Sequence, residues 1–150
     1  MRCILQRVKD CSVTVNGNVV GAIERGILLY LGITQKDSEK DAEYLVKKTL
    51  GLRIFEDQNG KMNLSVTDFP TYQVMVISQF TLYGTVTKGR RPSYDRAAHP
   101  EHAEMLYEYF LSRLKETGIG VESGVFQSHM DVEYCNSGPV TRLMDSEKTF

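Results

Sequence analysis

The chain has 150 residues, of which 18 are Lys or Arg and 19 are Asp or Glu, so its formal charge is −1. At roughly 100–200 residues per domain, this length predicts one domain with room for a hydrophobic core. The balanced charge excludes an acidic disordered chain and a strongly basic nucleic-acid module. A local basic face would still permit RNA binding.

The cysteines and the apolar stretches indicate the compartment. Cys3, Cys11 and Cys135 are an odd number and form no Cys-x-x-Cys pair, so we expect reduced thiols packed as small apolar side chains. The longest apolar stretch, residues 27–33, is far shorter than the roughly 20 residues of a membrane-spanning helix, and no signal-peptide pattern precedes it. We therefore expect a soluble, cytoplasmic protein with no membrane partner.

The first third of the chain alternates as β-strands do. Residues 2–9 and 12–15 are rich in apolar and β-branched residues, and Asn-Gly-Asn at 16–18 predicts a tight hairpin into a strand at 19–23. Residues 27–33 are apolar on both faces, which predicts a central strand.

A helix is predicted next. Ser38 and Asp41 have the spacing of a capping box, and Gly51 ends the helical pattern. One apolar stripe at helical spacing is formed by Ala42, Leu45, Val46, Thr49 and Leu50.

The rest of the chain predicts more strands and a second helix. Residues 52–55 predict a short strand, 72–83 the longest strand, and 84–99 a long loop without period. Pro100 suits the first turn of a helix that stops at Gly118.

Two final strands are predicted at residues 126–134 and 140–144. Because strands outnumber helices and several are joined by short turns, the pattern indicates a single α+β domain. We expect curled, largely antiparallel sheets around a shared core with two covering helices. No Gly-rich strand-to-helix turn supports a doubly wound fold.

Polar side chains directly follow the predicted strand that ends near residue 78. Ser78, Gln79 and Thr81 either line a cleft there or mark the emergence of the strand into solvent. The local pattern alone favours emergence, because an unpaired buried polar group costs about 1–3 kcal/mol.

The turn Asn-Ser-Gly-Pro at 136–139 also has two interpretations. The composition favours an ordinary turn between two strands. The alternative is a cis peptide between Gly138 and Pro139, since X-Pro bonds are where cis is cheap. Its two carbonyl oxygens would lie in parallel and accept hydrogen bonds from an ammonium group.

A basic cluster lies in the predicted loop, and conventional catalytic sets are missing. Lys88, Arg90, Arg91 and Arg96 are either solvated surface or a phosphate-binding loop. The three histidines, His99, His102 and His129, have no metal-ligand spacing, and nothing supports Ser78 or Thr81 as a nucleophile activated by His129.

Several short motifs occur in one order along nearly the whole chain. They are Leu-Gln-Arg-Val at 5–8, Ser-Gln-Phe-Thr at 78–81, Gly-Arg-Arg-Pro-Ser at 89–93, Gly-Val-Phe at 124–126 and Asn-Ser-Gly-Pro-Val-Thr at 136–141. The second and the last in this order are a specific pair. On these residues the chain resembles the bacterial D-aminoacyl-tRNA deacylase family, as a single domain over residues 1–150.

The resemblance implies a barrel-like α+β subunit in a homodimer whose active sites lie at the subunit interface. It implies hydrolysis of the ester bond of D-aminoacyl-tRNA, and also of tRNA-Ala that has been mischarged with glycine. The partner would be the aminoacylated 3′ end of tRNA, without DNA, metal or cofactor.

The resemblance also assigns residues to roles. Ser78, Gln79, Phe80 and Thr81 would form the catalytic segment, with the N–H groups around Phe80 and Thr81 as an oxyanion hole. A cis Gly138–Pro139 from the partner subunit would hold the substrate amino group and exclude an L side chain. Phe126, Met130 and Arg7 would belong to the substrate and adenosine site, and Lys88, Arg90 and Arg91 would contact tRNA phosphates.

Two alternatives stay open. In the first mechanism, water is the nucleophile and the terminal ribose 2′-OH assists it. In the second, the Thr81 hydroxyl attacks the ester itself. In a different class, the chain would be a non-catalytic protein that binds the tRNA acceptor end on the same fold.

Overall fold

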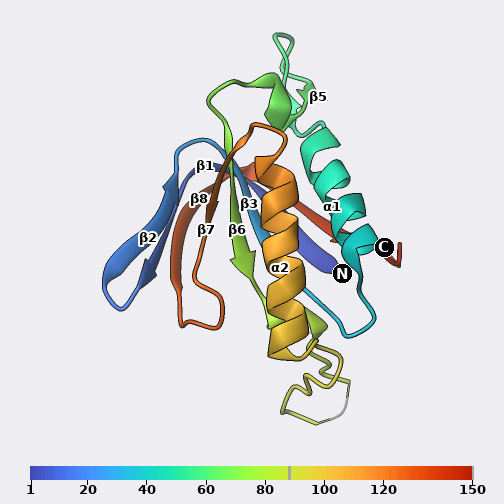
Figure 1. Cartoon of the computed structure of the whole chain (residues 1–150). Coiled ribbons are helices and arrows are strands. Elements are labelled where there is room, and N and C mark those ends of the chain that lie inside the picture. Colours follow the sequence, from blue (N-terminus) through green and yellow to red (C-terminus); the bar gives the residue numbers. More distant parts are fainter. Residues whose placement is uncertain (88, 150) are drawn as a thin grey trace.

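The computed structural model describes residues 1–87 and 89–149 (Figure 1). The elements in chain order are β1 (Arg2–Val15), β2 (Asn18–Ile23), β3 (Gly26–Gly32), α1 (Glu39–Gly51), β4 (Phe55–Glu56), β5 (Met62–Leu64), the 3₁₀ turn η1 (Val66–Asp68), β6 (Gln73–Ser78), the 3₁₀ turn η2 (Phe80–Tyr83), α2 (Pro100–Lys115), β7 (Gly120–Ser123) and β8 (Asp131–Asp145).

One mixed sheet curls into a nearly closed barrel. Its strand order is β2-β1-β3-β6-β7, and β8 pairs with β1 as well. The β1 pairings are antiparallel, whereas β3–β6 and β6–β7 are parallel. The curl brings β2 against β7, where a Cβ on Gly21 would stand 2.7 Å from the Ser123 carbonyl oxygen. The predicted α+β barrel-like fold is confirmed.

The first hairpin forms as predicted, but its first strand is longer. Asn16 and Gly17 have φ of 50° and 79°, the left-handed pair that a tight two-residue turn requires. The segments predicted at 2–9 and 12–15 are one strand, β1. The predicted break between the two segments was wrong. Cys11 pairs with both β2 and β8, so the strand pairing of β1 continues past the polar residues that precede Cys11.

The final strand differs more from its prediction. Residues 126–130 are not a strand, and β8 runs unbroken through the predicted turn at 136–139. Between the pairs Val8–Asn136 and Gln6–Thr141, β8 advances five residues while β1 advances two. The extra residues bulge away from the ladder, so a turn-like sequence is accommodated inside one strand.

The strand predicted at 72–83 ends earlier, at Ser78. Its partner β3 ends at Gly32, and the Gln79 N–H makes a last bond, 2.8 Å long, to the Leu31 carbonyl oxygen. With no further partner strand, the chain folds into η2.

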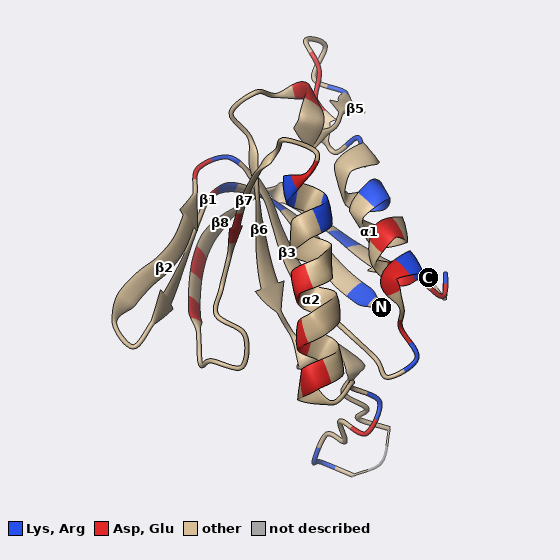
Figure 2. Ribbon diagram, viewed as in Figure 1, with Lys and Arg blue, Asp and Glu red and all other residues tan. Residues whose placement is uncertain are grey.

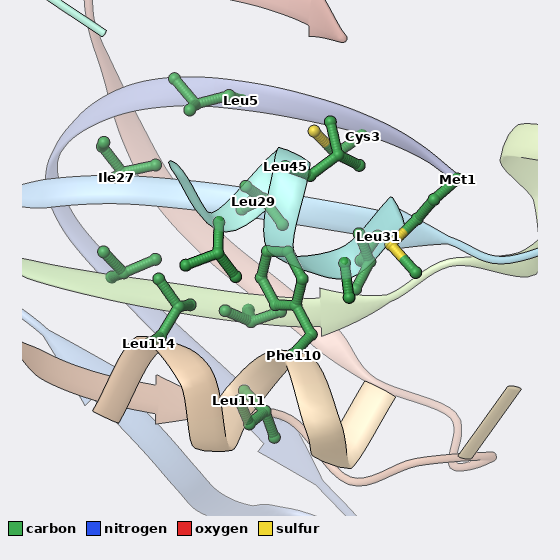
Figure 3. Close-up of a cluster of buried hydrophobic side chains, with 14 of the residues drawn as sticks. Met1, Cys3, Leu5, Ile27, Leu29, Leu31, Leu45, Phe110, Leu111 and Leu114 are labelled. Carbon is green, nitrogen blue, oxygen red and sulfur yellow. The ribbon is translucent and has the colours of Figure 1, made fainter. Parts of the chain in front are cut away.

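Both predicted helices cover one face of the sheet. Ser38 and Asp41 form the predicted capping box, with the Ser38 N–H 2.9 Å from the Asp41 carboxylate. Figure 3 shows Phe110 and Leu114 of α2 and Leu45 of α1 directed toward the β3 side chain of Leu29. In the described part of the chain, no helix is long and apolar enough to cross a bilayer.

A second apolar cluster fills the curl of the sheet. It consists of Val8, Cys11, Val13, Ile23, Leu28, Met75 and Ile77. Burial raises the pKa of the Cys3 thiol to about 12 and that of Cys11 to about 11, so both behave as packed apolar side chains. Cys135 is exposed on β8, so its predicted burial was wrong.

Two neighbouring residues of α2 test how the helix is held. Leu106→Ala removes a side chain that is 1% exposed, and we expect it to lower the free energy of unfolding by about 2–5 kcal/mol. Met105→Ala removes one that is 56% exposed and should change it by about 0.5 kcal/mol or less. Urea unfolding at one protein concentration measures both, and equal effects would contradict the packing described.

Candidate functional site

A cavity lies at the carboxyl ends of the parallel strands β3 and β6. This cavity, the strand-end pocket, has a volume of about 680 Å³. It is lined by Leu31, Ile33, Ile77, Ser78, Gln79, Phe80, Ala97, Ala98, Pro100, Ala103, Phe126, Gln127, Ser128, His129, Met130 and Val132. Ligands of sheets with parallel strands commonly bind at such ends. The cleft interpretation of Ser78 and Gln79 is therefore the one the structure supports.

The segment that follows β6 presents main-chain donors. Phe80 and Thr81 begin η2, and within the described residues their N–H groups have no hydrogen-bond acceptor. Free N–H groups at the start of a helical turn are arranged to bind a negative charge. The Gln79 side-chain amide donates to the Thr81 hydroxyl, which fixes the two side chains relative to each other.

The Phe80 side chain points outward. It is 58% exposed and contacts the Tyr94 ring edge to face, with the centroids 5.1 Å apart. Phe80 therefore borders the pocket through its main chain and forms, with Tyr94, an apolar rim.

Phe126 and Met130 also line the strand-end pocket. Both are half-buried, and Phe126 packs at 5.7 Å between ring centroids against Tyr107. The Tyr107 hydroxyl donates a 2.9 Å bond to the Val76 carbonyl oxygen, and burial raises the pKa of Tyr107. A Cβ on Gly124 would stand 2.4 Å from the Met130 sulfur, so a larger residue there would displace the Met130 side chain.

Sequence reasoning missed Gln127 and Ser128, and it considered His129 only as an unsupported activator of Ser78 or Thr81. Gln127, Ser128 and His129 line the pocket, and Gln127 has a φ of 59°. His129 is 94% exposed in its side chain and lies 3.7 Å from Asp131. Among the described lining residues, His129 alone is titratable. The sequence signal that was available is their position between two predicted site residues.

A network behind the pocket holds the segment before α2. The Ala98 N–H donates to the Ile33 carbonyl oxygen at 2.9 Å, and the Thr34 hydroxyl donates to the Arg96 carbonyl oxygen at 2.5 Å. Asp37 accepts from the Thr34 N–H at 2.8 Å and from the Met1 ammonium group. Burial raises the pKa of Asp37, and these hydrogen bonds oppose that rise. Residues 97–100 are thus fixed as a pocket wall.

His99, at the N-cap of α2, and His102, in its first turn, do not line the strand-end pocket. The His102 ring lies 3.1 Å from the Asp37 carbonyl oxygen, and His99 contributes its N–H to the Gln35 side chain at 3.1 Å. Both contacts tie α2 to the loop after β3.

Gly138 and Pro139 lie apart from the strand-end pocket in this chain. Their peptide bond is cis, and both residues are exposed on the bulge of β8. Gly138 has a φ of +118°, and a Cβ there would stand 2.9 Å from the Arg7 guanidinium, so glycine is required. It borders a different cavity of about 450 Å³, the Gly138 pocket.

Two side chains anchor the bulge. Arg7 donates to the carbonyl oxygens of Ser137 at 3.2 Å and Ile54 at 2.8 Å. Asn136 donates to the carbonyl oxygens of Arg7 at 3.2 Å and Val140 at 3.1 Å. Arg7 thus contacts the bulge that carries Gly138, as the family resemblance implies, and it does not line the strand-end pocket with Phe126 and Met130.

The basic cluster lies on the loop beneath α2. Main-chain bonds of 2.8 and 3.0 Å between Thr85 and Ser93 close this loop, and Arg90 and Arg91 are exposed on it. Arg96 is also exposed, and its guanidinium lies 5.7 Å from the centroid of the Tyr83 ring. Lys88 lies outside the described residues. Figure 2 shows acidic residues along the adjacent half of α2, which accounts for much of the charge balance.

Residues 1–87 and 89–149 contain no cluster of His, Cys, Asp and Glu suited to a metal ion. The strand-end pocket offers the free N–H group of Phe80, hydroxyl and amide side chains, and the Phe126 ring, and the free N–H group of Thr81 follows directly in the chain.

Two solved structures share the fold of this chain. A structure titled "Structural Analysis of a probable eukaryotic D-amino acid tRNA deacylase" superposes with a TM-score of 0.82 at 20% identity, over 96% of this chain and 98% of that one. A second, titled "c-Myc DNA Unwinding Element Binding Protein", has a TM-score of 0.90 at 41% identity, over 97% and 98%. The fold is thus that of the tRNA deacylases.

The family follows from the sequence comparisons. The model of the D-Tyr-tRNA(Tyr) deacylase family matches residues 4–145. Proteins named D-aminoacyl-tRNA deacylase from Koribacter versatilis and Symbiobacterium thermophilum are 57% and 53% identical over 150 residues, with 100% of this chain and 100% and 99% of theirs covered. The chain belongs to the D-Tyr-tRNA(Tyr) deacylase family, whose members are hydrolases of ester bonds.

The anchoring of the β8 bulge gives a prediction. Asn136→Ala removes two bonds to carbonyl oxygens, and we expect the free energy of unfolding to fall by about 1–3 kcal/mol because the buried acceptors lose their donor. Hydrogen exchange of the amides around Gly138 should accelerate. Asn59→Ala, at an exposed turn, is the control and should change neither quantity. Unchanged exchange in Asn136→Ala would refute the anchoring role.

Proposed function

We propose that this chain, as one domain over residues 1–150, hydrolyses the ester that joins a D-amino acid to the 3′-terminal adenosine of tRNA. Family membership and the names of the relatives support the substrate class. The observation that carries the proposal is the free N–H group of Phe80, which lines the strand-end pocket, followed directly by the free N–H group of Thr81.

The chemical step requires stabilisation of an oxyanion. Water attacks the ester carbonyl carbon, and the carbonyl oxygen acquires negative charge that the N–H groups of Phe80 and Thr81 bind. The carbon–oxygen bond to the ribose 3′ oxygen then breaks, and this oxygen takes up a proton as the carboxylic acid leaves. Ser78 and Gln79 hold the segment, and the ribose 2′-OH assists the water in a pocket that has little titratable character.

Selection of D over L substrates is assigned to Gly138 and Pro139 of a second subunit in a homodimer. Their carbonyl oxygens accept hydrogen bonds from the substrate ammonium group, so that an L side chain collides with this main chain and a D side chain points away. Glycine has no side chain to exclude, so glycyl-tRNA is expected to be hydrolysed. The separation of Gly138 from Ser78 within one chain supports a site completed across two subunits.

The remaining residues bind the nucleic acid. Phe126 offers a ring for stacking on the terminal adenine, and Met130 completes that apolar wall. Arg7 acts through the bulge that it anchors. Lys88, Arg90 and Arg91 contact phosphates near the acceptor end.

The substrate assay tests the proposal directly. Equal concentrations of D-Tyr-tRNA and L-Tyr-tRNA are incubated with the enzyme, and release of the labelled amino acid is followed. We expect rapid hydrolysis of the D form only. Binding of tRNA without any hydrolysis would instead favour the non-catalytic acceptor-end protein, and equal hydrolysis of both forms would refute the chiral filter.

Substitutions at Phe80 separate main-chain from side-chain roles. Phe80→Pro removes the N–H at the first position of η2, which tolerates proline, and we expect kcat to fall by about 10²–10³-fold. Phe80→Ala keeps the N–H and should stay within about tenfold of the wild type, since the side chain is mostly exposed. Equal losses in both variants would contradict the oxyanion hole.

The rate of D-Tyr-tRNA hydrolysis by Thr81→Ala decides between water and Thr81 as the nucleophile. Removal of a catalytic nucleophile costs several orders of magnitude in kcat. Thr81→Ala keeps the N–H group, so we expect only a modest loss if water is the nucleophile.

A further inference from the structure

The Gly138 pocket has the composition of a nucleotide site, and no role has been given to it above. Its lining residues come from β1, from the segment before β3, from the β4–β6 region and from the β8 bulge. They are Arg7, Val8, Lys9, Arg25, Phe55, Glu56, Phe69, Tyr72, Ser137 and Gly138. The volume of about 450 Å³ lies within the roughly 300–1,000 Å³ of ligand pockets.

The charges of this pocket are unbalanced. Glu56 lies 3.7 Å from Arg7, and Arg7 is already held by main-chain carbonyl oxygens. Lys9 and Arg25 are exposed, and in the described part of the chain neither has a carboxylate within ion-pair distance. The pocket therefore offers two free cationic groups to an anion.

An aromatic surface lies beside these cations. The rings of Phe69 and Tyr72 stack with centroids 4.2 Å apart and an interplanar angle of 13°. The Phe55 ring packs tilted against Tyr72, with 5.1 Å between the ring centroids. Phe69 and Tyr72 are half-buried, and both line the Gly138 pocket, so part of each ring faces the cavity. Free cations next to such a surface suit a phosphate with an attached base, as in proteins that bind single-stranded nucleic acid.

Local geometry fixes this combination. Gln73 donates its N–H to the Arg25 carbonyl oxygen at 3.1 Å, which sets Arg25 beside Tyr72. Gly26 permits the close approach, because a Cβ there would stand 1.9 Å from the Gln73 carbonyl oxygen. Arg7 and Lys9 are two residues apart on β1 and share a face.

We propose that the Gly138 pocket binds the nucleotide that precedes the terminal adenosine in the single-stranded 3′ end of tRNA, with its phosphate on Lys9 and Arg25 and its base on Tyr72. This inference rests on the proposed function, since Gly138 then borders both this pocket and the partner's strand-end pocket. The tRNA strand leaving the partner's pocket meets the Gly138 pocket first.

The experiment compares two substrates in the intact dimer. They are D-Tyr-tRNA and 3′-O-D-tyrosyl-adenosine, which lacks the preceding nucleotide. For Lys9→Ala/Arg25→Ala we expect the ratio of kcat/KM between tRNA and the minimal substrate to fall about tenfold. The salt dependence of kcat/KM for tRNA should become shallower by about 1 in log–log slope.

Lys40→Ala/Lys47→Ala is the matched control, because it removes two exposed lysines from α1, away from both pockets. Its substrate ratio and salt slope should equal those of the wild type. An unchanged ratio in Lys9→Ala/Arg25→Ala, or a ratio lowered equally in the control, would overturn the nucleotide site while leaving the proposed function intact.

Two further outcomes are distinguished. If light scattering shows that Lys9→Ala/Arg25→Ala is monomeric while the control is dimeric, the pocket is a subunit contact and the proposal is wrong. If the wild type hydrolyses neither substrate, the proposed function fails. Fluorescence anisotropy with a labelled single-stranded RNA tetranucleotide then tests the site without hydrolysis, and equal affinity of the wild type and the variant would refute it.

Discussion

The pairing of β1 along both of its edges is the constraint on which the molecule depends. One edge carries β2 and β3 in succession, and the other carries β8 over nearly its whole length. Because β2 and β3 share an edge, the sheet must curl until β2 meets β7. The curl creates an inner apolar cluster, while α1 and α2 cover the outer face.

The same pairings place the two pockets at opposite ends of the parallel strands. β3 and β6 run from the neighbourhood of Arg25 and Tyr72 to Leu31 and Ser78. The Gly138 pocket therefore lies where these strands begin, and the strand-end pocket lies where they finish. While β3 and β6 stay paired, the bulge with Gly138 and the Ser78 segment of one chain remain at opposite ends of these strands. A function that needs Gly138 and Ser78 in one site would therefore need two chains.

Local signals were enough for most elements of the fold. Asn16 and Gly17 have the turn preferences of a tight hairpin, and Ser38 and Asp41 cap α1 through contacts three residues apart. The errors concern long-range pairing. The end of β6 depends on where β3 stops, and the continuity of β8 depends on its register with β1. The site segments were found by resemblance, whereas the lining role of Ser128 depends on a loop conformation that no local pattern encodes.

The near-neutral total charge conceals an uneven distribution that fits a transient partner. Exposed arginines gather on the loop at 85–93 and near the Gly138 pocket, while acidic residues line the first half of α2 (Figure 2). Each phosphate contact adds to affinity and to its salt dependence. An enzyme that must release every tRNA it inspects is hindered by a broadly basic surface, because slow dissociation then limits turnover. Basic residues confined to a few points near the bound 3′ end of the tRNA orient the tRNA and still permit its rapid release.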